Sequence, residues 1–244
     1  MSEQLHTRAA WWALVLLTAT YTFSFIDRQI INLLVDPIRT DLSLSDSQVS
    51  FLQGLAFVLP YVILSIPLGR IVDRANRIRV LVIGILVWTI SCVTCGLAKN
   101  FWQLGVARMG VGAGEASVTP ASWSLLADYF PEDRRALPVS IFLMGPYLGA
   151  GLSLILGAEV VGWASGLGSI ELPVVGALAP WQLTFMLVKV ELLSRCHFKG
   201  VKVQPLLYDT MATSSEILSG IDLESSFGKH ISKMSRLWKL IKNL

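Results

Sequence analysis

Long apolar runs separated by short charged links dominate the first two thirds of the chain. The pattern predicts five membrane-spanning helices, at about residues 11–35, 49–68, 80–98, 101–126 and 137–158. Each run supplies roughly the 20 apolar residues that a helix needs to cross a bilayer core of about 30 Å. A sixth helix begins at Trp181 and stays apolar only through Val188, so we expect an incomplete helix over 181–194. The predicted fold class is an all-α membrane protein.

The link from Gly69 to Arg79 is short and contains four arginines. So short a link makes the second and third helices antiparallel neighbours and gathers the arginines at one membrane face. Seven basic residues lie on that face: Arg8, Arg70, Arg74, Arg77, Arg79, Arg134 and Arg135. Only Arg39 and Lys99 lie on the other face. Because basic links favour the cytoplasm, we expect a multi-pass protein of the cell (inner) membrane with a cytoplasmic N-terminus.

Composition supports the membrane assignment and excludes several kinds of chemistry. Hydrophobic residues make up 53% of the chain and charged residues 15%, against about a quarter charged in soluble proteins. Cys92 and Cys95 lie inside an apolar run with no histidine nearby, so we interpret them as packing residues rather than a redox or metal site. We expect no metal, no cofactor, no nucleic-acid partner and no enzymatic activity, because no nucleophile has a base beside it.

Four charged residues lie inside the predicted helices. They are Asp27 and Arg28 in the first helix and Arg108 and Glu115 in the fourth. A charge near the bilayer centre is costly unless it faces protein or water. One interpretation is a structural ion pair between two helices. The interpretation we favour is a set that handles protons or substrate in an aqueous cavity, in which Asp27 approaches Glu115 and an arginine stabilises one charge. Arg108 is close enough to the outer end of its helix to snorkel.

Small residues recur in the fourth and fifth helices. Gly112 lies among glycines in the fourth, and Gly145, Gly149, Ser153 and Gly157 follow one another at four-residue spacing in the fifth. Small residues at this spacing let membrane helices approach closely, so we expect tight helix packing there. Pro60, Pro67, Pro120 and Pro146 interrupt helical hydrogen bonds and allow kinks.

Gly69, Asp73, Arg74 and Arg77 together resemble the signature that joins helices two and three in the major facilitator superfamily. Asn76 stands where that signature has a glycine, and asparagine tolerates the left-handed backbone expected there. The resemblance implies that Gly69, Asp73, Arg74 and Arg77 form a cytoplasmic gate.

Two further motifs resemble the same superfamily. Arg108-x-x-x-Gly112, followed by Gly114-Glu115-Ala116, is similar to its helix-four signature. Gly145-Pro146-x-x-Gly149 matches part of its helix-five antiporter signature. The superfamily has twelve spans in two six-helix halves, each made of two inverted three-helix repeats. The resemblance therefore predicts that this chain is an amino-terminal half.

Phe25-Ile26-Asp27-Arg28, with Gly114-Glu115-Ala116 and Leu125 to Pro131, is more specifically similar to the Spinster-like branch. That branch is associated with amphiphilic, lipid-like substrates such as lysophospholipids. The resemblance implies secondary active transport of small organic or lipid-like solutes across the bilayer, coupled to protons. It also implies that Asp27, Arg28 and Glu115 are coupling or substrate positions, and Arg108 is taken with them.

The resemblance stops inside the sixth helix, at about Lys189. We therefore divide the chain into a transmembrane half-bundle, 1–188, and a polar cytoplasmic tail, 189–244, with a candidate amphipathic helix at 229–244. The abrupt loss of pattern predicts a truncated carrier whose partner is a missing carboxy-terminal half. The alternative is a non-transporting membrane protein that associates with a full-length carrier.

Overall fold

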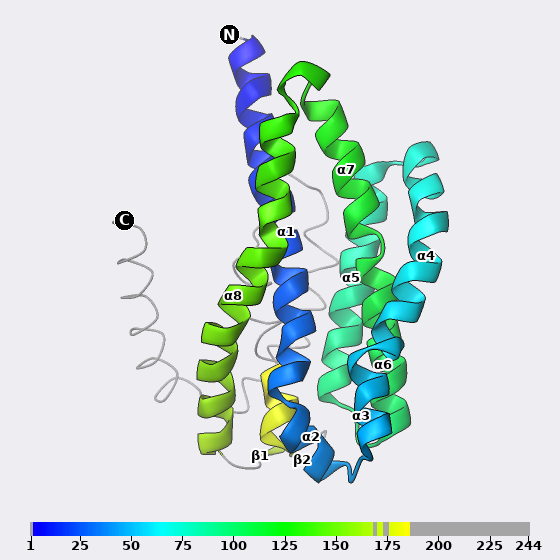
Figure 1. Cartoon of the computed structure of the whole chain (residues 1–244), viewed down its shortest axis with the longest axis vertical. Coiled ribbons are helices and arrows are strands. Elements are labelled where there is room, and N and C mark those ends of the chain that lie inside the picture. The colour runs from blue at the N-terminus through cyan, green and yellow to red at the C-terminus, as the bar shows by residue number, and fades with distance from the viewer. Residues whose placement is uncertain (1, 168–169, 173–175, 186–244) are drawn as a thin grey trace.

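The computed structural model describes residues 2–167, 170–172 and 176–185, and these form an elongated helical bundle (Figure 1). Its elements are α1 (Ser2–Leu33), α2 (Val35–Asp41), α3 (Asp46–Gln53), α4 (Leu55–Arg74), α5 (Arg77–Gly96), α6 (Phe101–Glu115), α7 (Val118–Tyr129), a 3₁₀ turn (Glu132–Arg134) and α8 (Ala136–Leu167), followed by strands β1 (Ile170–Leu172) and β2 (Gly176–Leu178). The predicted all-α class is confirmed, and the short antiparallel hairpin β1–β2 is the one departure among the described residues.

Polar residues and proline set where these helices begin and break. Ser45 and Gln48 form a reciprocal capping box at the start of α3. The helix predicted at 101–126 is present as α6 and α7, separated at residues 116–117. Pro120 explains the break, because it has no N–H to bond the carbonyl of Ala116. Asn76 is extended, with φ −69°, and caps α5 by accepting from Arg79 N at 3.1 Å, so the expected left-handed backbone there is wrong.

Two interfaces made by glycines hold the bundle. α8 packs along α1, where a Cβ on Gly149 would lie 2.4 Å from the Thr22 carbonyl oxygen. α6 packs on both α4 and α5, and a Cβ on Gly112 would lie 2.3 Å from the Phe57 carbonyl oxygen. At these contacts the helices approach backbone to backbone, which no larger residue permits.

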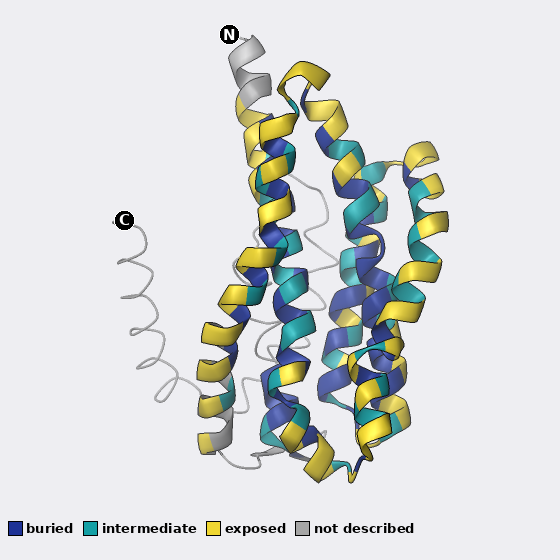
Figure 2. Ribbon diagram, viewed as in Figure 1, coloured by how far each residue is buried: buried dark blue, intermediate teal, exposed yellow. Residues whose placement is uncertain are grey.

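The outward faces of the bundle are apolar and exposed, while its centre is buried (Figure 2). Ile63 and Ile66 on α4 are both 63% exposed, whereas Trp88, Leu104 and Val111 belong to a buried cluster at the α5–α6 contact. Among the described residues, four segments are long and apolar enough to cross a membrane: Arg8–Leu33, Asp46–Arg74, Arg77–Gly96 and Ala136–Glu159. The break between α6 and α7 leaves each of these two helices too short to qualify alone.

The beginning of the predicted sixth helix is part of the bundle. Residues 180–185 are helical, and Trp181 Nε1 donates to Asp41 Oδ2 at 2.8 Å. Gln182 Nε2 donates to the Ala98 carbonyl at 2.9 Å. The remainder of the helix expected over 181–194, the tail and the candidate amphipathic helix lie outside the described residues.

Candidate functional site

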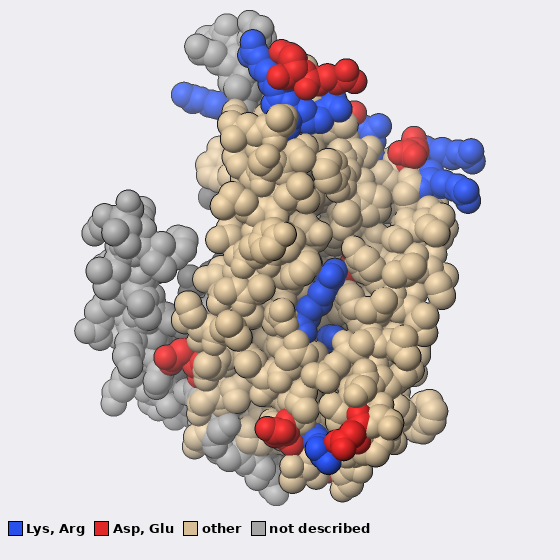
Figure 3. Space-filling model, viewed as in Figure 1, with Lys and Arg blue, Asp and Glu red and all other residues tan. Residues whose placement is uncertain are grey.

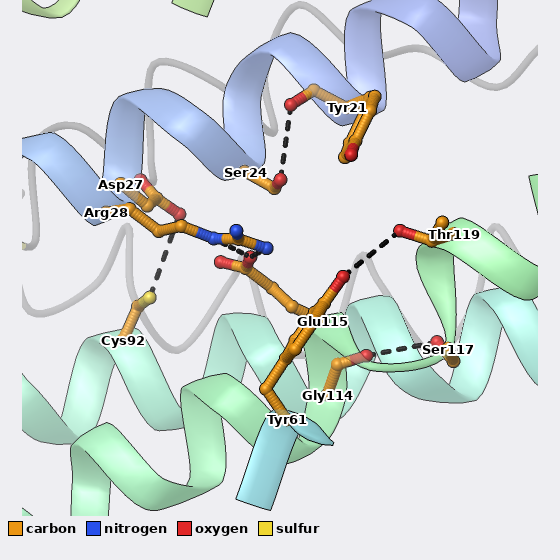
Figure 4. A network of polar contacts seen from close by, with 10 residues as sticks. All are labelled: Tyr21, Ser24, Asp27, Arg28, Tyr61, Cys92, Gly114, Glu115, Ser117 and Thr119. Atoms are coloured by element: carbon orange, nitrogen blue, oxygen red, sulfur yellow. Dashed lines mark hydrogen bonds and ion pairs between the residues drawn. The ribbon is translucent and has the colours of Figure 1, made fainter. Parts of the chain in front are cut away.

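An ion pair between α1 and α6 lies inside the bundle, far from its charged ends. Arg28 Nη2 lies 2.7 Å and Nε 2.8 Å from Glu115 Oε2 (Figure 4). The Arg28 side chain is 22% exposed and that of Glu115 is 0% exposed. Because 87 residues separate the partners, the contact joins two helices that local sequence does not bring together.

Aromatic rings surround the Arg28 guanidinium. Its Cζ atom lies 4.6 Å from the ring centres of Phe25 and Phe57, and 4.9 Å from that of Tyr61. A cation over an aromatic face is attracted by the ring quadrupole, more strongly where water is excluded. The site thus presents a positive charge within an apolar, aromatic wall.

Arg108 belongs to the same interior, so the expectation that it snorkels to the outer end is wrong. It is 1% exposed, and its guanidinium carbon lies 5.5 Å from the Phe57 ring centre. Its Nε has no hydrogen-bond partner among the described residues. Residue 108 is one helical turn from Leu104 and Gly105 on α6, and all three are buried against neighbouring helices, which removes the route to water. Phe57 therefore contacts two arginines.

Asp27 is also buried, at 5% exposure, and its Oδ2 accepts from Cys92 Sγ on α5 at 3.8 Å. It is Arg28, the next residue, that contacts Glu115. Cys92 and Cys95 are both buried on α5. Among the described residues, no three metal-ligating side chains cluster closely enough to hold a metal ion.

Hydroxyl groups beside the ion pair were missed by sequence reasoning. Tyr61 Oη and Thr119 Oγ1 lie 3.2 Å apart, and Tyr21 points toward them from α1 (Figure 4). The signal was available in part, because Tyr21 and Ser24 precede Arg28 at the helical spacing of seven and four residues. The pairing of Tyr61 with Thr119 had no such signal, since 58 residues separate them.

The predicted gate residues lie away from the central ion pair, at one end of the bundle. Asp73 and Arg74 are exposed at the end of α4, and a Cβ on Gly69 would meet no atom within 4 Å. Arg77 forms an ion pair with Asp128 at the end of α7, which joins the α4–α5 link to α7. Figure 3 shows that most charged side chains gather at the two ends, while basic atoms also lie in a hollow at mid-height.

Comparison with known proteins agrees with this architecture. The family model of the Major Facilitator Superfamily matches residues 17–190 of this chain. The chain is 31% identical over 159 residues to an MFS-type efflux pump of Mycolicibacterium smegmatis, covering 64% of this chain and 37% of the pump. It is 26% identical over 148 residues to a probable sphingolipid transporter, spinster homolog 2, of Arabidopsis thaliana, covering 61% of this chain and 27% of the relative.

A solved structure resembles the bundle as well. It is the crystal structure of a bacterial homologue of the human lysosomal transporter Spinster, inward-facing and occupied. The TM-score is 0.66 at 33% identity, over 73% of this chain and 41% of that one. The chain thus spans less than half the length of each of these relatives. Its helical bundle and its match over residues 17–190 show that the chain belongs to the Major Facilitator Superfamily, within its Spinster-like branch.

Proposed function

We propose that this chain is the amino-terminal bundle of a secondary active transporter for small organic or amphiphilic, lipid-like solutes. The observation that carries the proposal is the Arg28–Glu115 ion pair, which is largely buried, lined by aromatic rings and made between two helices. The names of the relatives support transport in general, and the plant relative's name supports a lipid-like substrate.

The pair also supports coupling to protons. Burial disfavours an ionised carboxylate, and the adjacent guanidinium is what stabilises the charge on Glu115. A proton on Glu115 removes that partner and leaves Arg28 with a net positive charge in an apolar wall. An anionic headgroup of the substrate then replaces the carboxylate, while the rings of Phe25, Phe57 and Tyr61 contact its apolar portion. Proton and substrate binding are thereby linked through one arginine.

The decisive measurement is substrate flux against pH, in a carrier that contains this bundle and a second one. Glu115→Gln mimics the protonated acid permanently, so we expect transport without the wild-type pH dependence but with some substrate binding retained. Asp27→Asn tests the second buried carboxylate in the same way. Glu132→Gln, at the exposed α7–α8 link, is the matched control and keeps the wild-type profile. A wild-type profile for Glu115→Gln would make the pair a structural contact only.

The gate is a separate part of the proposal. Asp73, Arg74 and Arg77 surround the α4–α5 link, and the contact of Arg77 with Asp128 ties that link to α7. We expect Asp73→Asn to reduce transport while membrane insertion is unchanged. Normal flux in this variant would reduce the link to a basic cluster that sets topology.

The alternative is that the chain associates with a carrier and does not transport by itself. Alternating access rocks one bundle against another, and the described residues form one bundle. We therefore expect the purified chain to accumulate no substrate in liposomes. Uptake that collapses with the pH gradient would instead imply that two copies assemble into a working carrier.

We also propose that the N-terminus and the α4–α5 link face the cytoplasm. Figure 1 places the start of α1, the α4–α5 link and the α7–α8 link at the same end of the bundle, so their basic residues share one side. A tag at Ser2 is then protected from external protease in intact cells, and a tag at Ser45 is accessible. Reversed labelling would overturn this orientation and the cytoplasmic assignment of the gate.

A further inference from the structure

We infer that the corner between α4 and α5 is a binding site for an anionic phospholipid. Arg70, Arg74 and Arg79 are exposed there, and among the described residues none of their guanidinium groups has a hydrogen-bond or ion-pair partner. Arg77, by contrast, is paired with Asp128. Asp73 is the one acidic residue of the link, so the three unpaired arginines leave this corner with a net positive charge.

The arginines continue the apolar outer faces of their helices. On α4, Leu59, Ile63 and Ile66 are 46%, 63% and 63% exposed, and Arg70 and Arg74 follow at the same helical spacing. This face therefore changes from aliphatic side chains to guanidinium groups at one level. An acyl chain against the isoleucines would bring a phosphate to the arginines.

The neighbouring helix has the same arrangement. Arg79 begins a stripe on α5 that continues with Ile83 and Ile90, which are 60% and 50% exposed. Because α4 and α5 are antiparallel and both pack on α6, the two stripes end at the same corner. An aliphatic surface that ends in unpaired arginines matches a two-chain lipid with a negatively charged headgroup.

The α7–α8 link, at the same end of the bundle, lacks such a group of unpaired arginines. The α7–α8 link contains Glu132 and Asp133 beside Arg134 and Arg135, so its charges cancel. Arg134 lies 3.5 Å from Asp133, and Arg135 donates to the carbonyls of Phe130 and Ala127 at the end of α7. Its arginines are already engaged, and this link is the natural control.

The test is titration of the purified full chain with phosphatidylglycerol or phosphatidylcholine of identical acyl chains, followed by native mass spectrometry. The variant R70Q/R79Q spares the proposed gate residues. A basic residue at a membrane surface is worth about fivefold in binding to an anionic lipid, so the double variant should bind phosphatidylglycerol roughly 30-fold more weakly. Phosphatidylcholine binding and the R134Q control should be unchanged.

Three results would overturn the inference. One is wild-type binding that does not distinguish the two lipids. Another is a double variant that binds phosphatidylglycerol as tightly as the wild type, which would move the anionic-lipid site elsewhere on the chain. The third is an equal loss for R134Q, which would mean that only net charge matters. Helical content measured by circular dichroism verifies that each variant is folded, as expected for exposed positions.

Discussion

Two ion pairs of nearly equal length lie in opposite surroundings. Arg28 and Glu115 approach to 2.7 Å at mid-height, with side chains 22% and 0% exposed. Arg39 and Asp46 approach to 2.8 Å at the end opposite the gate, with side chains 50% and 82% exposed. Attraction between charges grows as water is excluded, but so does the cost of leaving either charge without its partner. The distance alone therefore says little about what each pair contributes.

The comparison also separates local from long-range contacts. Arg39 and Asp46 are seven residues apart and join α2 to the neighbouring α3. The Arg28–Glu115 pair joins α1 to α6, between a part of the bundle built from α1 and α8 and a part built from α4 to α7. A change in the middle pair alters how two groups of helices are held together. A change in the end pair alters a link that water already solvates.

The largest effect is expected from Glu115→Ala. Removing one member of a buried pair leaves the other charge uncompensated, at a cost of about 3 kcal/mol in the free energy of unfolding. Chemical denaturation in mixed micelles, followed by circular dichroism, measures this loss. Glu132→Ala, at an exposed position, is the control and should change stability little. A loss for Glu115→Ala no larger than for this control would show that water reaches the middle pair.

A smaller effect is expected from Gly149→Ala. Its Cβ would lie 2.4 Å from the Thr22 carbonyl, a backbone atom that cannot move without shifting α1, so we expect a loss of about 1–3 kcal/mol. Gly69→Ala is the matched change at the end of the bundle, where a Cβ meets open space. Alanine favours the helix there by about 0.5–1 kcal/mol. Equal unfolding free energies for the two variants would argue against the close α1–α8 contact.

The smallest effects are expected at the exposed pairs. Asp128→Asn and Asp46→Asn should each lower stability by at most about 1 kcal/mol, because solvent competes with these contacts. Added salt should shrink the difference from the wild type further, since exposed charges are screened. A salt-independent loss for Asp128→Asn would show that its contact with Arg77 is shielded from solvent, which would strengthen its assignment to the gate.

The sequence predicted the helices themselves better than it predicted which helices pack against one another. The apolar runs predicted α1, α4, α5 and α8 because a stretch of about 20 mostly apolar residues has few stable conformations in a bilayer other than a helix. The break after Glu115 was anticipated only as a kink at Pro120. Asn76 was predicted in a left-handed turn and instead caps α5, since its side chain satisfies the free N–H of Arg79.

The charged residues show the same division. Periodicity and hydropathy identified Asp27, Arg28, Arg108 and Glu115 as charges inside the membrane, because each interrupts an apolar run. The hydropathy of the chain does not specify how far each helix is rotated about its own axis. For that reason the sequence alone brought Asp27 toward Glu115 and left open which arginine stabilises the charge, and it directed Arg108 toward the outer end.

Composition and the spacing of apolar residues were thus enough to determine that this chain is a helical membrane protein with charged residues in its interior. Both conclusions follow from the free energy of moving each side chain out of water. Only the tertiary structure decided which charges meet. Packing of α8 on α1 through Gly149, and of α6 on α4 through Gly112, sets the rotation that points Arg28 at Glu115. Partners 87 residues apart are chosen by how helices pack, which no local pattern records.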